Sequence, residues 1–268
     1  MSRYVWPREH GSWGILLFPF LSAVVLAGGG NLLSLAAFAA AMAAFMAREP
    51  LIVVSRQRWV WKQPKPETEA AWRTLWIVLP IAALSGVALW LGGVDMTWLL
   101  GLGAVAVTLT AVSVYATLHQ LQRSTALQVV GSFGLTLSAA LAWLAAGREP
   151  DRTLALLVAA QTIHATGGVL TVHARLEALQ NRKAASPKLA ERTAALGWQT
   201  IQALAAAWLA FTGEPLLALS LVVPLAIHLF DLVRLDRESV LRTPLKTVGY
   251  RELFLSLLVS VLIVVALW

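Results

Sequence analysis

Long apolar stretches alternate with short polar segments along the whole chain. A helix that crosses a membrane needs about 20 mainly apolar residues, and the stretches are close to that length. Backbone polar groups inside lipid must satisfy one another, so such stretches are helices or barrel strands. They show no alternation of period two, which favours helices. The pattern therefore predicts nine transmembrane helices, at about 11–29, 31–47, 72–92, 97–117, 125–146, 152–172, 193–212, 214–231 and 250–268.

Polar connections of unequal length join the predicted helices. Long loops are expected after the second, sixth and eighth helices, at about 48–71, 173–192 and 232–249. Short connections follow the first, third, fifth and seventh helices. We therefore expect one all-α transmembrane domain over residues 1–268, a polytopic bundle with its long loops on one side.

Basic residues concentrate on the side of the long loops. All but two of the 21 Lys and Arg residues fall there, and the two exceptions are Arg148 and Arg152. Basic loops tend to stay in the cytoplasm. The distribution therefore predicts a cytoplasmic N-terminus and cytoplasmic long loops, in a multi-pass protein of the bacterial cytoplasmic (inner) membrane.

The start of the chain admits a second interpretation. Arg3 and Arg8, followed by an apolar run, resemble a cleavable signal peptide. Glu9, His10 and Pro19 fit that interpretation poorly, and another apolar stretch begins at residue 31. We therefore expect a transmembrane helix at this position.

The composition agrees with a membrane protein. Hydrophobic residues make up 58% of the chain and charged residues 13%, well below the roughly 25% charge of a soluble domain. A net charge of +7 would suit a nucleic-acid binder. The bases lie in short segments between apolar runs, however, so we expect membrane lipids or an anionic ligand as partners and no nucleic acid. The chain has no cysteine, which excludes disulfides and cysteine-ligated metals.

Charged residues interrupt the end of the second predicted helix. Arg48 and Glu49 are followed by the apolar stretch from Leu51 to Val54, and Arg56 lies beyond it. Charges at membrane depth are unfavourable and often functional, so these residues are candidates for an anion site just inside the membrane face. Arginine side chains that reach out to the headgroups explain the same pattern.

A polar stripe runs along the sixth predicted helix. At about 3.6 residues per turn its members share one face, and His173 and Glu177 flank that face. The stripe consists of Gln161, His164, Thr171, Arg175 and Arg182. It indicates a ligand-lined cavity, although a hydrogen-bonded helix contact would use the same residues. We predict that the basic ends of the second and sixth helices meet beneath one cavity open to the cytoplasm.

Three further pairs of polar residues are interpreted as structural. The first pair is expected to hydrogen-bond between helices, the second to pair within one helix, and the third to mark the membrane interface. These pairs are Gln199 with Gln202, His228 with Asp231, and Arg251 with Glu252. No motif for nucleotide binding, a zinc helix or a nucleophile elbow is present, and neither a cofactor nor a metal is predicted.

The opening segment resembles the start of the YwiC-like family of bacterial membrane proteins. That family begins with Pro-Lys/Arg-x-His-Gly-x-Trp and continues with an apolar run that contains a proline. The matching residues are Pro7, Arg8, His10, Gly11, Trp13 and Pro19. The motif covers about a tenth of the chain, and the nine-helix layout extends the likeness. The resemblance implies a membrane protein without implying an activity.

A more distant resemblance is to the UbiA-type prenyltransferase superfamily. Its members have nine helices and Asp-rich motifs after helices 2 and 6, which hold Mg²⁺ and the substrate diphosphate. The corresponding stretches here read AREPLIVVSRQRW and HARLEALQNRK and contain no aspartate. Only Glu49 and Glu177 offer carboxylates, so we expect the usual metal chemistry to be lost. The arginines in their place suit direct binding of a phosphate or carboxylate, and they are Arg48, Arg56, Arg175 and Arg182.

Three functions stay open at this point. The first is binding of an anionic or isoprenoid-like amphiphile in a cytoplasm-facing cavity, which the arginines favour. The second is prenyl transfer by a UbiA-like enzyme that uses Glu49, Glu177 and His173 as a degenerate metal site. The third is transport of a small molecule along the polar stripe. Whether the protein is an enzyme is left open by the sequence.

Overall fold

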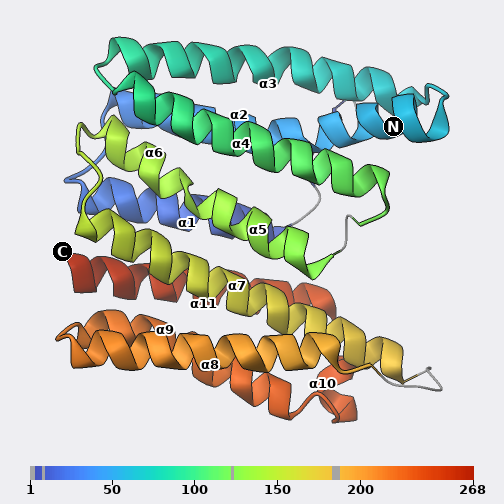
Figure 1. Cartoon of the computed structure of the whole chain (residues 1–268), viewed down its shortest axis with the longest axis vertical. Coiled ribbons are helices and arrows are strands. Elements are labelled where there is room, and N and C mark those ends of the chain that lie inside the picture. Colours follow the sequence, from blue (N-terminus) through green and yellow to red (C-terminus); the bar gives the residue numbers. More distant parts are fainter. Residues whose placement is uncertain (1–3, 8–9, 122–123, 183–187) are drawn as a thin grey trace.

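The computed structural model of the chain consists of helices that run side by side (Figure 1). It describes residues 4–7, 10–121, 124–182 and 188–268, without the side chains of His10, Ser239 and Val240. Within these residues there is no strand. The helices are α1 His10–Leu26, α2 Leu32–Ser55, the π-helix η1 Arg56–Trp61, α3 Pro66–Leu91, α4 Met96–Leu118, α5 Thr125–Thr136, α6 Ser138–Ala145, α7 Arg152–Asn181, α8 Ala190–Phe211, α9 Pro215–Val233, α10 Glu238–Arg242 and α11 Leu245–Leu267.

The helices of the described residues form nine passes along the bundle, when η1 is counted with α2 and α6 with α5. This arrangement confirms the predicted all-helical membrane bundle. Seven passes are long and apolar enough to cross a membrane, and α1 contributes a shorter apolar helix over Gly11–Leu26. The remaining pass is α8, which carries Gln199 and Gln202 on its buried side. The chain is an integral membrane protein with multiple spans.

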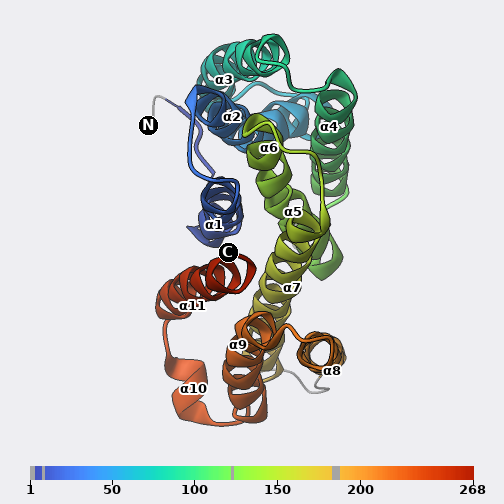
Figure 2. The same cartoon turned by 90° about the vertical axis from the view of Figure 1, so that its left-hand side faces the viewer.

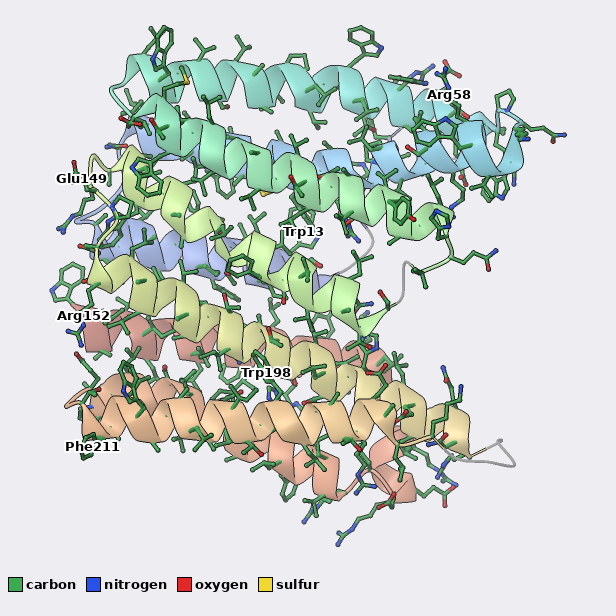
Figure 3. All side chains as sticks on the ribbon, in the orientation of Figure 1. Trp13, Arg58, Glu149, Arg152, Trp198 and Phe211 are labelled. Atoms are coloured by element: carbon green, nitrogen blue, oxygen red, sulfur yellow. The ribbon has the colours of Figure 1, made fainter. Side chains whose placement is uncertain are left out.

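The connections lie at two opposite ends of the bundle. Short turns after α1, α3, α6 and α8 lie at one end, together with the C-terminus (Figure 1). Arg58 lies at the other end, whereas Glu149 and Arg152 lie at the end of the short turns (Figure 3). We call the end with Arg58 the basic end and define it by residues 56–65, 119–121, 188–189 and 234–244.

The three predicted long loops are largely helical, so their predicted bounds are wrong. Helix α2 continues through Pro50, and η1 ends only at Trp61, where the left-handed φ of 52° at Lys62 stops it. Helix α7 continues to Asn181, α8 begins at Ala190, and the five-residue helix α10 lies between α9 and α11. Backbone hydrogen bonds form a helix whether or not its side chains are apolar, so a helix can continue beyond the end of the apolar run.

The helices form three neighbouring groups in the view from the end opposite the basic end (Figure 2). Helices α2, α3 and α4 lie on one side, α7, α8, α9 and α11 lie on the other, and α1, α5 and α6 lie between them. The main apolar core includes Trp143, Leu157, Leu217 and Ile263. These residues lie in the halves of their helices away from the basic end. Of the charged side chains in the interior, Arg175, Asp231 and Glu252 lie in the halves of their helices nearer the basic end.

Candidate functional site

Polar side chains of four helices meet inside the group formed by α7, α8, α9 and α11. His228 is fully enclosed and His164 is 2% exposed. Polar and charged groups at membrane depth are unfavourable unless they pair, so such a cluster calls for a functional explanation. This polar cluster consists of Gln161, His164, Thr171, Arg175, Gln199, Gln202, His228, Asp231, Arg251, Glu252, Ser256 and Ser260.

Ionisable groups of α9 and α11 form a continuous chain in the polar cluster. His228 Nε2 lies 3.0 Å from Glu252 Oε2. Arg251 Nη2 donates to Glu252 Oε1 at 3.0 Å and also to the carboxylate of Asp231. Arg175 adds a second guanidinium from α7, beside Asp231. With both imidazoles of the cluster neutral, its two arginines balance its two carboxylates.

Helix α7 contacts α9 and α11 through its own polar stripe. His164 Nε2 lies 2.9 Å from Ser256 Oγ, and Gln161 Nε2 donates to Ser260 Oγ at 2.7 Å. The ring of His164 is also stacked on that of His228, with centroids 6.2 Å apart and planes inclined by 3°. The predicted stripe is therefore buried against other helices from Gln161 to Arg175.

Three polar atoms without partners face one point beside Gly167. From the position that a Cβ on Gly167 would take, Gln202 Oε1 lies 2.9 Å away. His228 Nδ1 lies 3.3 Å and Gln199 Nε2 lies 3.4 Å from the same point. None of the three has a hydrogen-bond partner among the described residues. Gln202 Nε2 donates to the carbonyl of Leu221 at 2.8 Å, which leaves Oε1 turned toward the glycine. Buried polar atoms rarely lack partners, so their convergence indicates a place for a further polar group.

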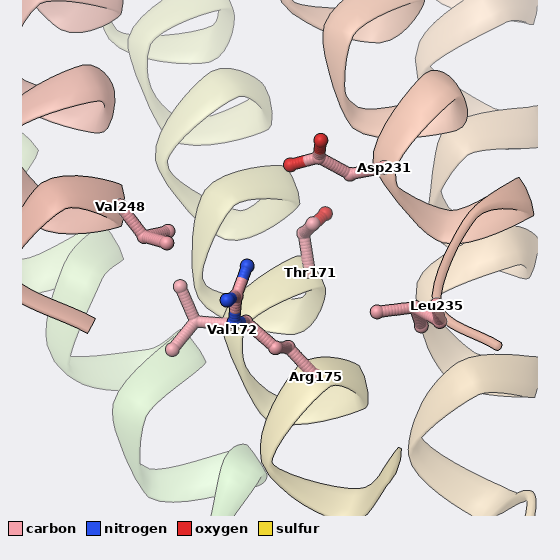
Figure 4. A pocket seen from close by; sticks show the side chains of 6 residues that line it. All are labelled: Thr171, Val172, Arg175, Asp231, Leu235 and Val248. Carbon is pink, nitrogen blue, oxygen red and sulfur yellow. The ribbon is translucent and has the colours of Figure 1, made fainter. Parts of the chain in front are cut away.

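Of the polar-cluster residues on α7, Arg175 lies nearest the C-terminal end of the helix, and it faces a small cavity together with Thr171 and Asp231 (Figure 4). Its Nη2 donates to the carbonyl of Thr243 at 2.7 Å, which holds the segment between α10 and α11. The cavity beside it measures about 10 Å³, the space of about one water molecule. Its lining consists of Thr171, Val172, Arg175, Asp231, Leu235 and Val248.

A larger hollow of about 380 Å³ lies at the basic end, between α7, α8 and α10. Apolar and charged side chains share its lining, and Arg192 Nη1 lies 3.1 Å from Asp236 Oδ1. The lining consists of Ala174, Glu177, Ala178, Asn181, Arg182, Leu189, Arg192, Leu235, Asp236 and Leu241. Of the predicted site residues, Glu177 and Arg182 therefore lie together here.

Glu177 and His173 both make contacts that hold helices together. The carboxylate of Glu177 accepts hydrogen bonds from the backbone N–H groups of Glu191 and Arg192, each with one oxygen at 3.1 Å. These N–H groups belong to the first turn of α8 and have no partner within that helix. His173 faces α5, where its Nδ1 lies 2.9 Å from Thr125 Oγ1. Both residues thus lie outside the polar cluster.

Arg48, Glu49 and Arg56 lie on α2 and η1, in another part of the bundle. All three are half-buried, and the guanidinium carbon of Arg56 lies 5.6 Å from the ring centroid of Trp61. Helices α1, α5 and α6 separate α2 from α7 (Figure 2). The structure therefore does not bring Arg48 to the polar stripe of α7, and the predicted meeting of the two helix ends is wrong.

Sequence reasoning missed how α9 pairs with α11. His228 and Asp231 were expected to pair with each other, and that expectation is wrong, because each contacts α11. Glu252 was assigned to the membrane interface, yet α11 begins at Leu245 and places Glu252 two turns inside the helix. The sequence predicted this helix from about residue 250. A predicted start at Leu245 would have placed Glu252 inside the membrane and not at its interface. The interhelical hydrogen bond expected of Gln202 is confirmed.

The opening motif contributes to the contact between α1 and α2. The ring of Trp13 packs edge-on against that of Phe45, with centroids 5.1 Å apart. Arg8 lies outside the described residues, and the side chain of His10 is not described. The other members are Pro7 before α1 and Gly11, Trp13 and Pro19 within it.

The comparison with family models gives one match. The model described as YwiC-like protein matches residues 6–146, more than half of the chain, from the segment before α1 to the end of α6. Comparisons with curated proteins and with solved structures found no match. The likeness to UbiA-type proteins therefore stays a prediction from the sequence. The polar cluster and the hollow lie on α7 to α11, beyond the matched residues.

Proposed function

We propose that this chain, which belongs to the YwiC-like family of membrane proteins, binds an anionic amphiphile at the basic end of α7 and α8. The observation that carries the proposal is the hollow of about 380 Å³, which combines leucines with arginines. An amphiphile presents the complementary pair of surfaces, an acidic headgroup and an apolar chain. The proposal includes a bacterial cytoplasmic membrane with the basic end in the cytoplasm, supported by the distribution of Lys and Arg.

The headgroup would contact Arg182 and Arg192 at the rim of the hollow. A guanidinium binds the paired oxygens of a phosphate or carboxylate in a bidentate manner. Arg192 is already paired with Asp236, but the side chain of that aspartate is 77% exposed. An ion pair with so exposed a member contributes little, so a headgroup can displace the aspartate.

The apolar chain would pack on Leu189, Leu235 and Leu241. Leu189 is 60% exposed, which leaves apolar surface at the mouth of the hollow. Each methylene group of the ligand that becomes buried contributes about 0.8 kcal/mol to the binding free energy. A few such groups therefore contribute more to binding than one exposed ion pair does. The ligand class is therefore a lipid-like anion and not a free phosphate.

Native mass spectrometry of the purified full chain tests this proposal. Dioleoyl phosphatidylglycerol should bind in preference to dioleoyl phosphatidylcholine, and the double variant Arg182→Gln, Arg192→Gln should lose that preference. The double variant Arg148→Gln, Arg152→Gln removes two charges at the opposite end and is the matched control. Equal retention of both lipids by the wild type, or an undiminished preference in the double variant, would contradict the proposal.

The polar cluster supports transport as a second candidate function. Ionisable residues inside a membrane bundle often mark a path for an ion or a substrate. Proton flux into pyranine-loaded vesicles that contain the protein should then exceed flux into protein-free vesicles, and Glu252→Gln should abolish the excess. Equal flux in both preparations would remove this candidate. Prenyl transfer gains no comparable support, because Glu49 and Glu177 lie in different parts of the bundle.

A further inference from the structure

We propose that His228, paired with Glu252, binds and releases a proton inside the membrane and exchanges it with the basic end of the bundle. The polar cluster is formally neutral when its imidazoles are neutral, because Arg175 and Arg251 balance Asp231 and Glu252. An imidazole is therefore the group that can accept a proton without breaking one of these charge pairs. The amphiphile site uses none of these residues, so the two proposals fail independently.

The contact with Glu252 determines which nitrogen of His228 accepts the proton. Nε2 lies 3.0 Å from a carboxylate oxygen of Glu252, so the neutral ring carries its hydrogen there. The lone pair of Nδ1 is then the acceptor. A hydronium ion at the basic end gives up one proton and becomes water, and the proton adds to Nδ1. The resulting imidazolium has Glu252 as its counter-ion, and release reverses the same step.

The surroundings of Nδ1 suit its protonated form. Gln202 Oε1, a buried acceptor without a partner among the described residues, faces the same point beside Gly167 as Nδ1. The bond from Gln202 Nε2 to the carbonyl of Leu221 fixes this orientation. A protonated Nδ1 becomes a donor and can supply the missing hydrogen through one bridging water molecule. The absence of a side chain at Gly167 leaves room for that contact.

The charged and titratable groups around His228 come from α7, α9 and α11. Helix α7 presents His164 and Arg175, α9 presents Asp231, and α11 presents Arg251 beside Glu252. Helix α8 presents only the amides of Gln199 and Gln202 to this point. Helix α1 has no titratable side chain over Gly11–Leu26. The centroid of the His164 ring lies 6.2 Å from that of His228, so a proton on one ring disfavours a second proton on the other.

The proposed route to the proton site runs toward the basic end. The cavity beside Arg175, of about one water molecule, lies between that end and the chain of Asp231, Arg251 and Glu252. In the other direction the fully buried Leu157, Leu217 and Ile263 belong to the continuous apolar core. An apolar core excludes water and therefore protons. The described residues thus place the exchange on the basic side.

Nitrogen-15 NMR of histidine-labelled full chain in lipid nanodiscs tests the proton site. The chain has five histidines, so single substitutions assign each ring signal. If the His228 ring exchanges a proton with the basic end, its imidazolium fraction should be larger at about pH 5 than at about pH 8. Glu252→Gln removes the counter-ion and should lower the imidazolium population of His228 roughly tenfold at a given pH. The exposed His119 should be unchanged in this variant.

Two outcomes would overturn the proton site. One is a His228 ring that keeps a single charge state across this range in the wild type, a result that needs no variant to fold. The other is an imidazolium population of His228 that is the same in Glu252→Gln as in the wild type.

Cysteine accessibility tests the direction of exchange, since the chain has no cysteine of its own. Val248→Cys places a thiol in the lining of the cavity beside Arg175, and Ile263→Cys places one in the apolar core. A water-soluble methanethiosulfonate should react with the first roughly tenfold faster, because thiolates form where water has access. Equal or reversed rates would contradict the proposed route.

Discussion

His228 Nε2 and Glu252 Oε2 lie 3.0 Å apart, although their residues belong to α9 and α11 and are separated by 24 positions in the chain. The helix α10 turn at the basic end brings the two helices back alongside each other. The pair therefore joins two membrane passes through ionisable groups. Such pairs are uncommon inside membranes and usually belong to functional sites.

Substitution of this carboxylate should destabilise the bundle. Glu252→Gln keeps the shape of the side chain but removes the charge that pairs with His228 and Arg251. We expect the free energy of unfolding in detergent micelles to fall by about 1–3 kcal/mol. Glu214→Gln, which breaks the exposed pair with Arg152 at the opposite end, should have an effect below about 1 kcal/mol. An equal loss of unfolding free energy in both variants would mean that the buried pair stabilises the bundle no more than the exposed pair does.

The glycine that faces the same carboxylate should not tolerate a methyl group. A Cβ on Gly168 would lie 3.1 Å from Glu252 Oε2 and would push that side chain away from His228. Gly168→Ala should therefore lower the midpoint of thermal unfolding and alter the ring signal of His228. Gly197→Ala is the matched control, because a Cβ there meets nothing within 4 Å. Since alanine favours a helix over glycine by about 1 kcal/mol, the control should be neutral or stabilising. A higher unfolding midpoint in Gly168→Ala than in the wild type would contradict the close approach of Gly168 to Glu252.

The start of α8 should depend on Glu177. Its carboxylate accepts hydrogen bonds from the backbone N–H groups of Glu191 and Arg192, as a capping residue does. Glu177→Ala should lower the free energy of unfolding by about 0.5–2 kcal/mol. It should also speed hydrogen exchange at those two amides. Glu238→Ala, which removes an exposed carboxylate from α10, should leave their exchange unchanged; identical exchange in wild type and Glu177→Ala would refute the cap.

The orientation of the bundle is testable with single cysteines, again because the chain has none. Arg58→Cys and Glu149→Cys place thiols at opposite ends of the bundle (Figure 3). If the basic end is cytoplasmic, a membrane-impermeant maleimide should label Glu149→Cys in intact spheroplasts and Arg58→Cys only in inverted vesicles. The reverse pattern would invert the proposed topology.

The number of helices could be predicted from the sequence, whereas their ends could not. Each apolar run of membrane length became one pass, because lipid leaves the backbone no other partner than itself. The end of the second run at Arg48 did not end the helix. The apolar stretch from Leu51 to Val54 continues it past Pro50, and a change in backbone conformation at Lys62 ends it. That conformation has no signature in the apolar pattern.

The candidate site was predictable only where one helix determined it. The stripe of α7 follows from helical periodicity, and it is buried from Gln161 to Arg175. The convergence of Gln202 and His228 at Gly167 depends on which helices are neighbours, which no single helix encodes. The separation of Arg48 from the α7 stripe also depends on which helices are neighbours, because α1, α5 and α6 lie between them.

The most direct measurement of the proposed function is photocrosslinking of the full chain in nanodiscs. The probe is a phosphatidylglycerol with a diazirine in its acyl chain, close to the headgroup. The account predicts adducts on the residues that wall the hollow, Leu189, Leu235 and Leu241, and their loss in the double variant Arg182→Gln, Arg192→Gln. Adducts confined to the outward faces of α3 and α4, or unchanged by the double variant, would contradict it.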